Sequence, residues 1–261
     1  DRVDIHKLTD TDVSGGDIVK IDKFTGSGGE GWQSQVELAG WNSPFFQYED
    51  PEADELTDAQ REYISSYMSD FEEALATGAM SIYRDLIDMG SFVDFMIIQE
   101  VSRNVDAYRL STFLHKHHES QGGRLHAGPV WDFNLGFGNA NYNDAFQTTG
   151  WAFNEGTPFW WSRFLDDPVF TEALRCRWER LRLTTLRNES ISSQISGYST
   201  TLEEAHVRNF QRWPILGQQI WPNYEVGDTY EEEVAFLEAW LLERVAWLDA
   251  HIPGTCPNTD Q

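Results

Sequence analysis

The middle of the chain contains one stretch whose hydrophobic pattern differs from that of the segments around it. Residues 107–133, AYRLSTFLHKHHESQGGRLHAGPVWDF, alternate apolar and polar side chains on both sides of a polar turn that contains Gly122 and Gly123. This pattern predicts two antiparallel strands joined by a turn, that is, a β-hairpin. Most other segments have the three- and four-residue spacing of amphipathic helices. The sequence therefore predicts an α+β fold that is mostly helical, with a small sheet in its first half.

The helices are predicted from apolar spacing and from residues that favour helix ends. In the segment after residue 57, apolar side chains recur every three or four residues from Tyr63 to Leu75, and Thr57 and Asp58 are candidate N-caps. Further helices are expected near residues 82–89, 91–103, 160–165, 168–183, 189–207 and 230–251.

The N-terminal part is expected to supply the remaining strands. Alternating residues on both sides of Gly15 and Gly16 predict two short strands, the second over Asp17–Lys23. Residues 26–60 are rich in glycine and then in acidic residues, which is typical of loops, although residues 35–38 have some strand potential.

Charge and hydropathy exclude several classes of function. The formal net charge of -24 over 261 residues repels nucleic acid and anionic membrane surfaces. No run approaches the roughly 18–20 apolar residues that a membrane span needs.

Two explanations of the acidity remain open. One is solubility in a salty or extracellular setting, and the other is binding of a divalent cation such as Ca²⁺ by the acidic segments 10–12 and 48–52.

Two aspartates flank the predicted hairpin. Asp106 precedes its first strand and Asp132 follows its second strand. Because a hairpin brings its two ends together, we expect both carboxylates at its open end. Paired carboxylates suit Mg²⁺ or Mn²⁺, which prefer oxygen ligands and bridge to phosphates. Protein kinases place a catalytic-loop Asp, two short strands and a metal-binding Asp in this order.

Longer segments resemble one known family. FVDFMIIQEVSRNVDAYRLSTFLHK and GPVWDFNLGFGN are similar to the core of the spore coat protein H (CotH) kinase family. The similarity continues through PFWWSRFLDDPVF, RCRWERLR, HVRNFQRWPILG and EVAFLEAWLLERVAWLD, and RVDIHKL with GGDIVKIDK is similar near the N-terminus. The resemblance implies an atypical protein-kinase-like fold and transfer of phosphate from ATP to Ser or Thr of secreted or surface proteins.

The resemblance also assigns roles to individual residues. Asp132 matches the metal-binding Asp of the family's WDF motif, and Asp106 matches the catalytic-loop Asp. Asn134 either completes the metal shell or caps the following turn. Asn104 is expected to fix the loop backbone. Glu100 is either a hydrogen-bonding residue at the end of its helix or part of the site.

Two departures from ordinary kinases bear on activity. Five residues after Asp106, where those kinases have an Asn that helps to hold a second metal ion, this chain has Ser111, a poorer ligand. The lobe that grips the phosphates is expected mostly upstream of Asp1. Lys20 and Lys23 are the nearby candidates for a phosphate-binding lysine, and the alternative for both is an exposed surface charge.

The predicted organisation is one CotH-like kinase domain over residues 1–261. Residues 1–56 would form the rest of the N-terminal lobe and a linker, 57–157 the catalytic core, and 158–261 a helical C-terminal part. We expect a secreted or cell-surface protein that binds ATP and an acceptor protein. The alternative is a non-catalytic kinase-like surface or assembly module that binds extracellular partners, with or without Ca²⁺.

Three clusters have both a structural and a functional interpretation. His115, His117 and His118 lie near the predicted turn. The structural interpretation is that they belong to a solvated turn, and the functional interpretation is that they bind a transition metal. The tryptophans are expected in the core rather than on a sugar-binding platform. The arginines of residues 175–182 are expected to pair with acidic neighbours rather than to dock phosphate. Cys176 and Cys256 are compatible with a disulfide or with two free thiols.

Overall fold

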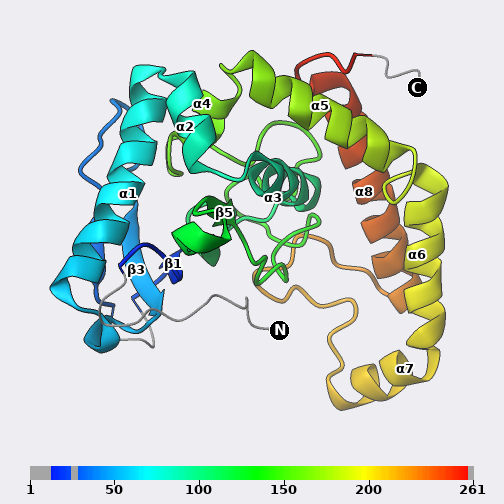
Figure 1. The fold of residues 1–261 in the computed structure, drawn as a ribbon. Helices are drawn as coiled ribbons and strands as arrows, with labels where there is room; N and C mark the ends of the chain where they lie inside the picture. The colour runs from blue at the N-terminus through cyan, green and yellow to red at the C-terminus, as the bar shows by residue number, and fades with distance from the viewer. Residues whose placement is uncertain (1–12, 25–28, 258–261) are drawn as a thin grey trace. The chain divides into compact units, whose positions relative to one another are not determined.

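The computed structural model describes residues 13–24 and 29–257, and in this part the chain has an α+β fold (Figure 1). Eight α-helices and one five-stranded antiparallel sheet are present among the described residues, so the predicted fold class is confirmed. The strand expected before Gly15 and the acidic segment 10–12 lie outside the described residues. No helix in the described ranges is both long enough and apolar enough to span a bilayer.

The sheet consists of β1 (Asp17–Ile21), β2 (Gly31–Gln33), β3 (Phe45–Asp50), β4 (Thr112–Lys116) and β5 (Leu125–Ala127). Its strand order is β2-β3-β1-β4-β5, and every pair is antiparallel. The central strand β1 joins the N-terminal strands to the hairpin β4-β5, and Ile21 is paired with Thr112 at the start of β4. The predicted hairpin is therefore confirmed, and the sheet extends it.

Two expectations for residues 26–60 are wrong. Residues 35–38 are not a strand, and β2 lies a few residues earlier. The six-residue strand β3 lies in the stretch that the sequence indicated as a loop, between Pro44 and Pro51. Its inner residues Phe46, Gln47 and Tyr48 are all buried, so the two-residue alternation that marks a half-exposed strand is missing.

The chain divides into two compact units, and each is made of segments that are not contiguous in sequence. Unit 1 contains the sheet and comprises residues 1–96, 106–132 and 153–173, and unit 2 comprises residues 97–105, 133–152 and 174–261. The helix α3 (Met89–Ser102) contributes residues to both, as does α5 (Pro168–Arg182).

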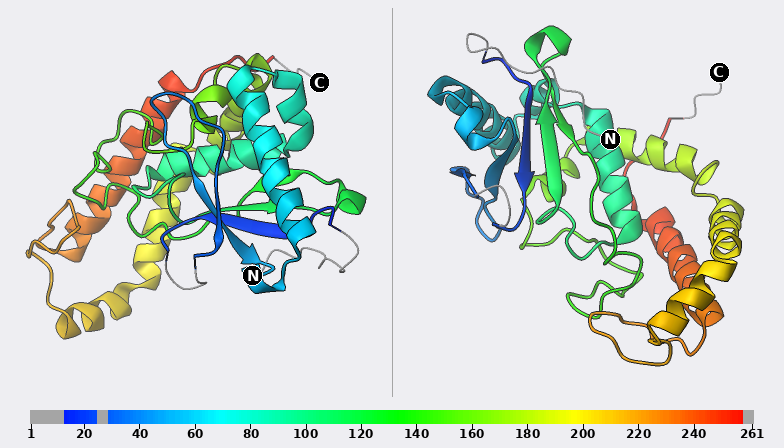
Figure 2. Two further views of the ribbon diagram at one scale, coloured as in Figure 1. Left: turned by 90° about the vertical axis from the view of Figure 1, so that its left-hand side faces the viewer. Right: turned by 90° about the horizontal axis from the view of Figure 1, so that it is seen from below.

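In unit 1 the long helix α1 (Asp58–Thr77) lies along one face of the sheet (Figure 2). Its start is fixed as predicted, because Thr57 and Gln60 form a capping box. The helices α2 (Met80–Leu86) and α4 (Trp160–Phe164) pack against α1. The core between these helices is aromatic, with fully buried side chains at Phe71, Phe92, Trp160, Trp161 and Phe164.

In unit 2 the helices α6 (Asn188–Thr201) and α8 (Tyr230–His251) lie side by side (Figure 1). A single helix was expected over residues 189–207, but the chain breaks at Leu202 and continues as α7 (Glu203–Arg212). Cys176 and Cys256 form a disulfide, which decides between the two alternatives that the sequence left open. Arg175 pairs with Glu179 and Arg182 pairs with Asp249, so these ion pairs are as predicted.

The tryptophans divide into two groups. Trp160, Trp161, Trp178 and Trp240 are buried core residues, as predicted. Trp213 and Trp221 were expected in the core as well but are 56% and 74% exposed, because they lie in the irregular segment between α7 and α8 rather than on a packed helix face.

Candidate active site

The open end of the hairpin is defined by the last hydrogen bond of the β4-β5 pair. The backbone N–H of Gly128 donates to the carbonyl of Phe113 at 2.8 Å, next to the paired residues Leu114 and Ala127. The opposite end is closed by a short 3-10 helix, Glu119–Gln121, and by Gly122 and Gly123 with positive φ angles. Asp106 precedes β4 and Asp132 follows β5, both in unit 1, so the chain leads to each aspartate from the same end of the hairpin.

Asp106 lies in a turn that connects α3 to β4. Its carbonyl accepts hydrogen bonds from the backbone N–H groups of Arg109 and Leu110. Its side chain is only 13% exposed, and Oδ1 accepts from the Arg109 guanidinium at 2.6 Å. A charge-assisted hydrogen bond of this length orients the carboxylate and compensates part of its charge. Arg109 is a site residue that the sequence analysis missed, although its i+3 spacing from Asp106 is a usable signal.

Asp132 has a different environment. It is exposed, and it follows Val130 and Trp131, which are 51% and 64% exposed. Its φ angle of 62° is in the left-handed region, which Asp and Asn tolerate better than other side chains with a Cβ. Because the residue is exposed, its carboxylate is accessible to a ligand from solvent.

The other predicted site residues are divided between the two units. Ser111 belongs to unit 1, is buried directly before β4, and has a φ angle of 49°. Asn104 is buried in unit 2. Asn134, also in unit 2, is exposed, and its carbonyl accepts from the side chain of Asn139 at 2.9 Å. The roles of all three residues at a metal or nucleotide remain predictions.

The two candidate lysines differ. Lys20 is only 7% exposed, so the interpretation of this residue as an exposed surface charge is wrong. Its ammonium lies 2.6 Å from the carboxylate of Glu49, because β1 and β3 are neighbouring strands. In protein kinases the phosphate-gripping lysine pairs with a glutamate on a helix, whereas Glu49 is on a strand. Lys23 is exposed just after β1.

Glu100 has a structural role in unit 2. Its buried carboxylate accepts from Arg244 at 2.9 Å and from the backbone N–H of Ala152 at 2.9 Å. Arg244 is fully buried and also donates to the carbonyls of Glu100, Thr148 and Gly150. Among the described contacts, this network supports the structural interpretation of Glu100. No local pattern in the sequence indicates Arg244 as the partner, because it lies 144 residues from Glu100.

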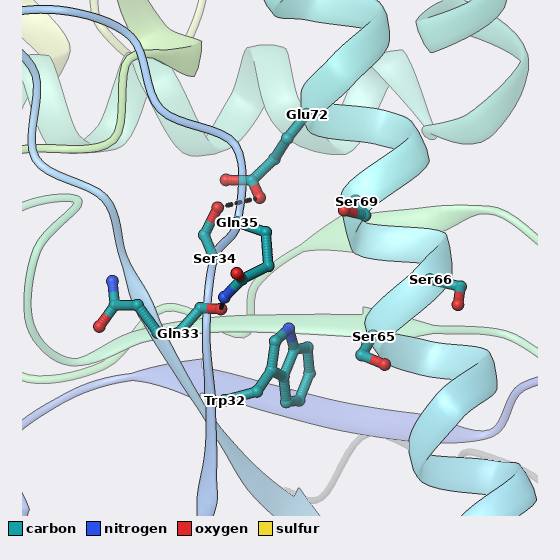
Figure 3. A pocket seen from close by; sticks show the side chains of 8 residues that line it. All are labelled: Trp32, Gln33, Ser34, Gln35, Ser65, Ser66, Ser69 and Glu72. Carbon is teal, nitrogen blue, oxygen red and sulfur yellow. Dashed lines mark hydrogen bonds between the residues drawn. The ribbon is translucent and has the colours of Figure 1, made fainter.

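Unit 1 also contains a pocket of about 350 Å³ between β2 and α1 (Figure 3). Trp32 to Gln35 form one side, and Ser65, Ser66 and Ser69 of α1 form the other, with Glu72 at one end. Ser34 donates to Glu72 at 2.6 Å. Neither Asp106 nor Asp132 lines this pocket.

A comparison with protein-family models gives a match to the CotH kinase protein over residues 1–248. This chain belongs to the CotH kinase family. The family resemblance inferred from the residues around the hairpin is thereby confirmed. A comparison with curated proteins gave no match. Family membership indicates a kinase-like protein, with ATP, a divalent metal ion and protein substrates as the general ligands of a kinase.

Proposed function

We propose that this protein is a secreted ATP-dependent protein kinase that phosphorylates Ser or Thr of extracellular or surface proteins with the help of a divalent metal ion. The observation that supports this most is the hairpin with Asp106 and Asp132 at one end, in a chain of the CotH kinase family. The same order of Asp, two strands and Asp forms the phosphoryl-transfer site of protein kinases.

The two aspartates would have different roles, in line with their environments. Asp132, which is exposed and offers oxygen donors only, would hold Mg²⁺ or Mn²⁺. The metal ion, when bound, would neutralise charge on the phosphates of ATP. Asp106, held by Arg109, would accept the proton of the acceptor hydroxyl, orient that hydroxyl, or share the metal ion.

The secreted location is supported by the disulfide. Both cysteines of the chain are used in the Cys176–Cys256 bond. Disulfides form and persist in oxidising compartments such as the extracellular space and are rare in the cytosol. The strongly acidic composition is compatible with the same setting.

The proposal is tested by calorimetric titration of ATP into the full-length protein, with Mg²⁺, with Mn²⁺ and with neither. Asp132→Asn is the informative variant, because Asn tolerates the left-handed backbone of this position and removes only the charge. We expect metal-dependent ATP binding that this variant weakens at least about tenfold, since an anionic ligand to the metal is lost.

The control variant is Asp70→Asn, which removes one exposed carboxylate of α1 in the same unit. It separates a specific site from the general attraction of divalent cations to a chain of net charge -24. Equal ATP affinity in Asp132→Asn and Asp70→Asn would contradict the proposed metal site.

A non-catalytic kinase-like module is the second candidate. The presence of Ser111 where ordinary kinases have a metal-binding Asn favours it. A folded full-length protein that binds no nucleotide with either metal would favour this module over the kinase.

A further inference from the structure

The hairpin carries a second group of chemically active side chains, which we call the histidine cluster: His115, His117 and His126. His115 and His126 are directly paired across β4 and β5. His117 lies two residues after His115, and side chains at such positions point to the same face of a strand. Lys116, between them, faces α1 on the other side of the sheet.

The sequence pointed to a different third member. His118 was grouped with His115 and His117, but it caps the 3-10 helix of the turn, accepting from the backbone N–H of Ser120, and its other ring nitrogen contacts Ser14. His126 takes its place because the turn length sets the pairing register of the hairpin. This register could not be derived from the sequence.

The three imidazoles are close enough to share an ion. Their ring centroids are separated by 4.6 to 5.1 Å. One ligand nitrogen from each ring lies within 4.8 Å of the other two. Two nitrogens bound tetrahedrally to Zn²⁺ at about 2.0–2.1 Å are about 3.4 Å apart. Small rotations of the side chains would therefore close the cluster around an ion.

The orientation of His115 is already that of a ligand. Its Nδ1 lies 3.0 Å from the carbonyl oxygen of Gly128. A carbonyl only accepts hydrogen bonds, so Nδ1 carries the proton of the ring. Nε2 is therefore unprotonated, and its lone pair can bind a metal ion. Metal-binding histidines are commonly fixed in this way by a backbone carbonyl or a carboxylate.

The charge next to the cluster also favours a cation. A carboxylate lies close by, because the backbone N–H of Asp88 donates to Leu125 at 2.8 Å. Asp88 Oδ1 is 3.8 Å from His126 Nδ1.

We propose that the histidine cluster binds one transition-metal ion of the Zn²⁺ class, which links β4 to β5. Three imidazoles suit Zn²⁺, Co²⁺, Ni²⁺ or Cu²⁺ and not Mg²⁺ or Ca²⁺, which prefer oxygen. Both cysteines are in the disulfide, so no thiolate of this chain competes for the ion. The proposed site does not depend on the proposed kinase activity, and it is tested separately.

The test is calorimetric titration of ZnCl₂ into chelator-treated full-length protein, with excess Mg²⁺ and Ca²⁺ present to occupy acidic surface groups. We expect one Zn²⁺ per chain in the wild type and in the control His118→Asn, in which the Asn oxygen preserves the cap of the turn. His126→Asn and, separately, His117→Asn are expected to lose at least about 100-fold in affinity, since each removes a direct ligand.

Titration with Co²⁺, followed by visible absorption, supplies a second readout. The absorption band of the bound Co²⁺ ion reports its coordination geometry and not merely its affinity. Near-ultraviolet circular dichroism of each metal-free variant shows whether it is folded. If one of the two histidine variants does not fold, the other still tests the proposal. Absence of stoichiometric Zn²⁺ binding in the wild type would overturn the proposal. Wild-type affinity in a folded His117→Asn or His126→Asn variant would overturn it as well.

Discussion

Glu72 is a carboxylic acid in an almost completely buried position of α1. Its two oxygens accept hydrogen bonds from Ser34 at 2.6 Å and from the indole N–H of Trp160 at 2.9 Å. Burial raises its pKa to about 7 in spite of these two donors, which favour the ionised form. The charge state of this side chain therefore changes near neutral pH, at one end of the pocket in Figure 3.

This raised pKa predicts a pH dependence of stability. Between the ordinary pKa of 4.5 and about 7, the folded chain holds a proton on Glu72 that the unfolded chain has lost. The contribution of Glu72 to the free energy of unfolding therefore falls as pH rises through this window and is constant above it. Relative to the wild type, Glu72→Gln should gain about 2–3 kcal/mol between about pH 5 and about pH 8.

Urea denaturation of both proteins across this pH range measures the effect. Glu73→Gln is the matched control, because Glu73 is the next residue in the chain and its side chain is exposed. Parallel pH profiles for Glu72→Gln and the wild type would show that Glu72 titrates normally.

At the scale of single residues, the sequence indicates which side chains are candidates for chemistry better than it indicates which residues they contact. Asp106 and Asp132 stand out because each flanks a recognisable hairpin. The contact between Glu72 and Trp160 joins residues 88 positions apart, and that between Glu100 and Arg244 joins residues 144 positions apart. Such pairs depend on which helices pack together, and local spacing carries no information about that.

Helices and strands differ in how much of their formation is local. The helices α1 and α8 begin where they were expected, because Thr57 with Gln60 and Thr229 with Glu232 form capping boxes that are visible in the sequence. The break at Leu202 between α6 and α7 was missed, since neither Gly nor Pro marks it. β2 and β3 were missed because their pairing is set by contacts with each other and with β1, and not by alternation.

The capping box of α1 predicts a measurable stability difference. Thr57→Ala leaves the N–H of Gln60 without its side-chain acceptor and should lower the free energy of unfolding by about 1 kcal/mol. Thr57→Ser keeps the hydroxyl and should retain most of the stability. Chemical denaturation of the two variants measures the difference, and equal losses would mean that the hydroxyl does not stabilise the helix.

At the scale of the whole molecule, long-range links hold each unit together. Each unit is assembled from segments far apart in sequence, and in unit 2 the disulfide closes a loop of 80 residues between α5 and the segment after α8. Cross-links that close long loops stabilise mainly by restricting the unfolded chain.

The double variant Cys176→Ser/Cys256→Ser is therefore expected to lose about 2–4 kcal/mol of stability. Thermal or urea denaturation with and without a reductant measures this loss. A reductant should destabilise the wild type and leave the double variant unchanged. Equal stability of the wild type in oxidising and reducing buffer would contradict a stabilising disulfide.

Kinase activity is best measured as transfer of the radiolabelled γ-phosphate of ATP by the full-length protein, to casein or to its own Ser and Thr residues, with Mg²⁺ or Mn²⁺. The proposed function predicts metal-dependent transfer that Asp106→Asn lowers by at least about 100-fold, since general-base or orienting contacts contribute about 10²–10⁴-fold, while Asp70→Asn retains it. A folded wild type that transfers no phosphate with either metal, or an Asp106→Asn variant with undiminished transfer, would contradict it.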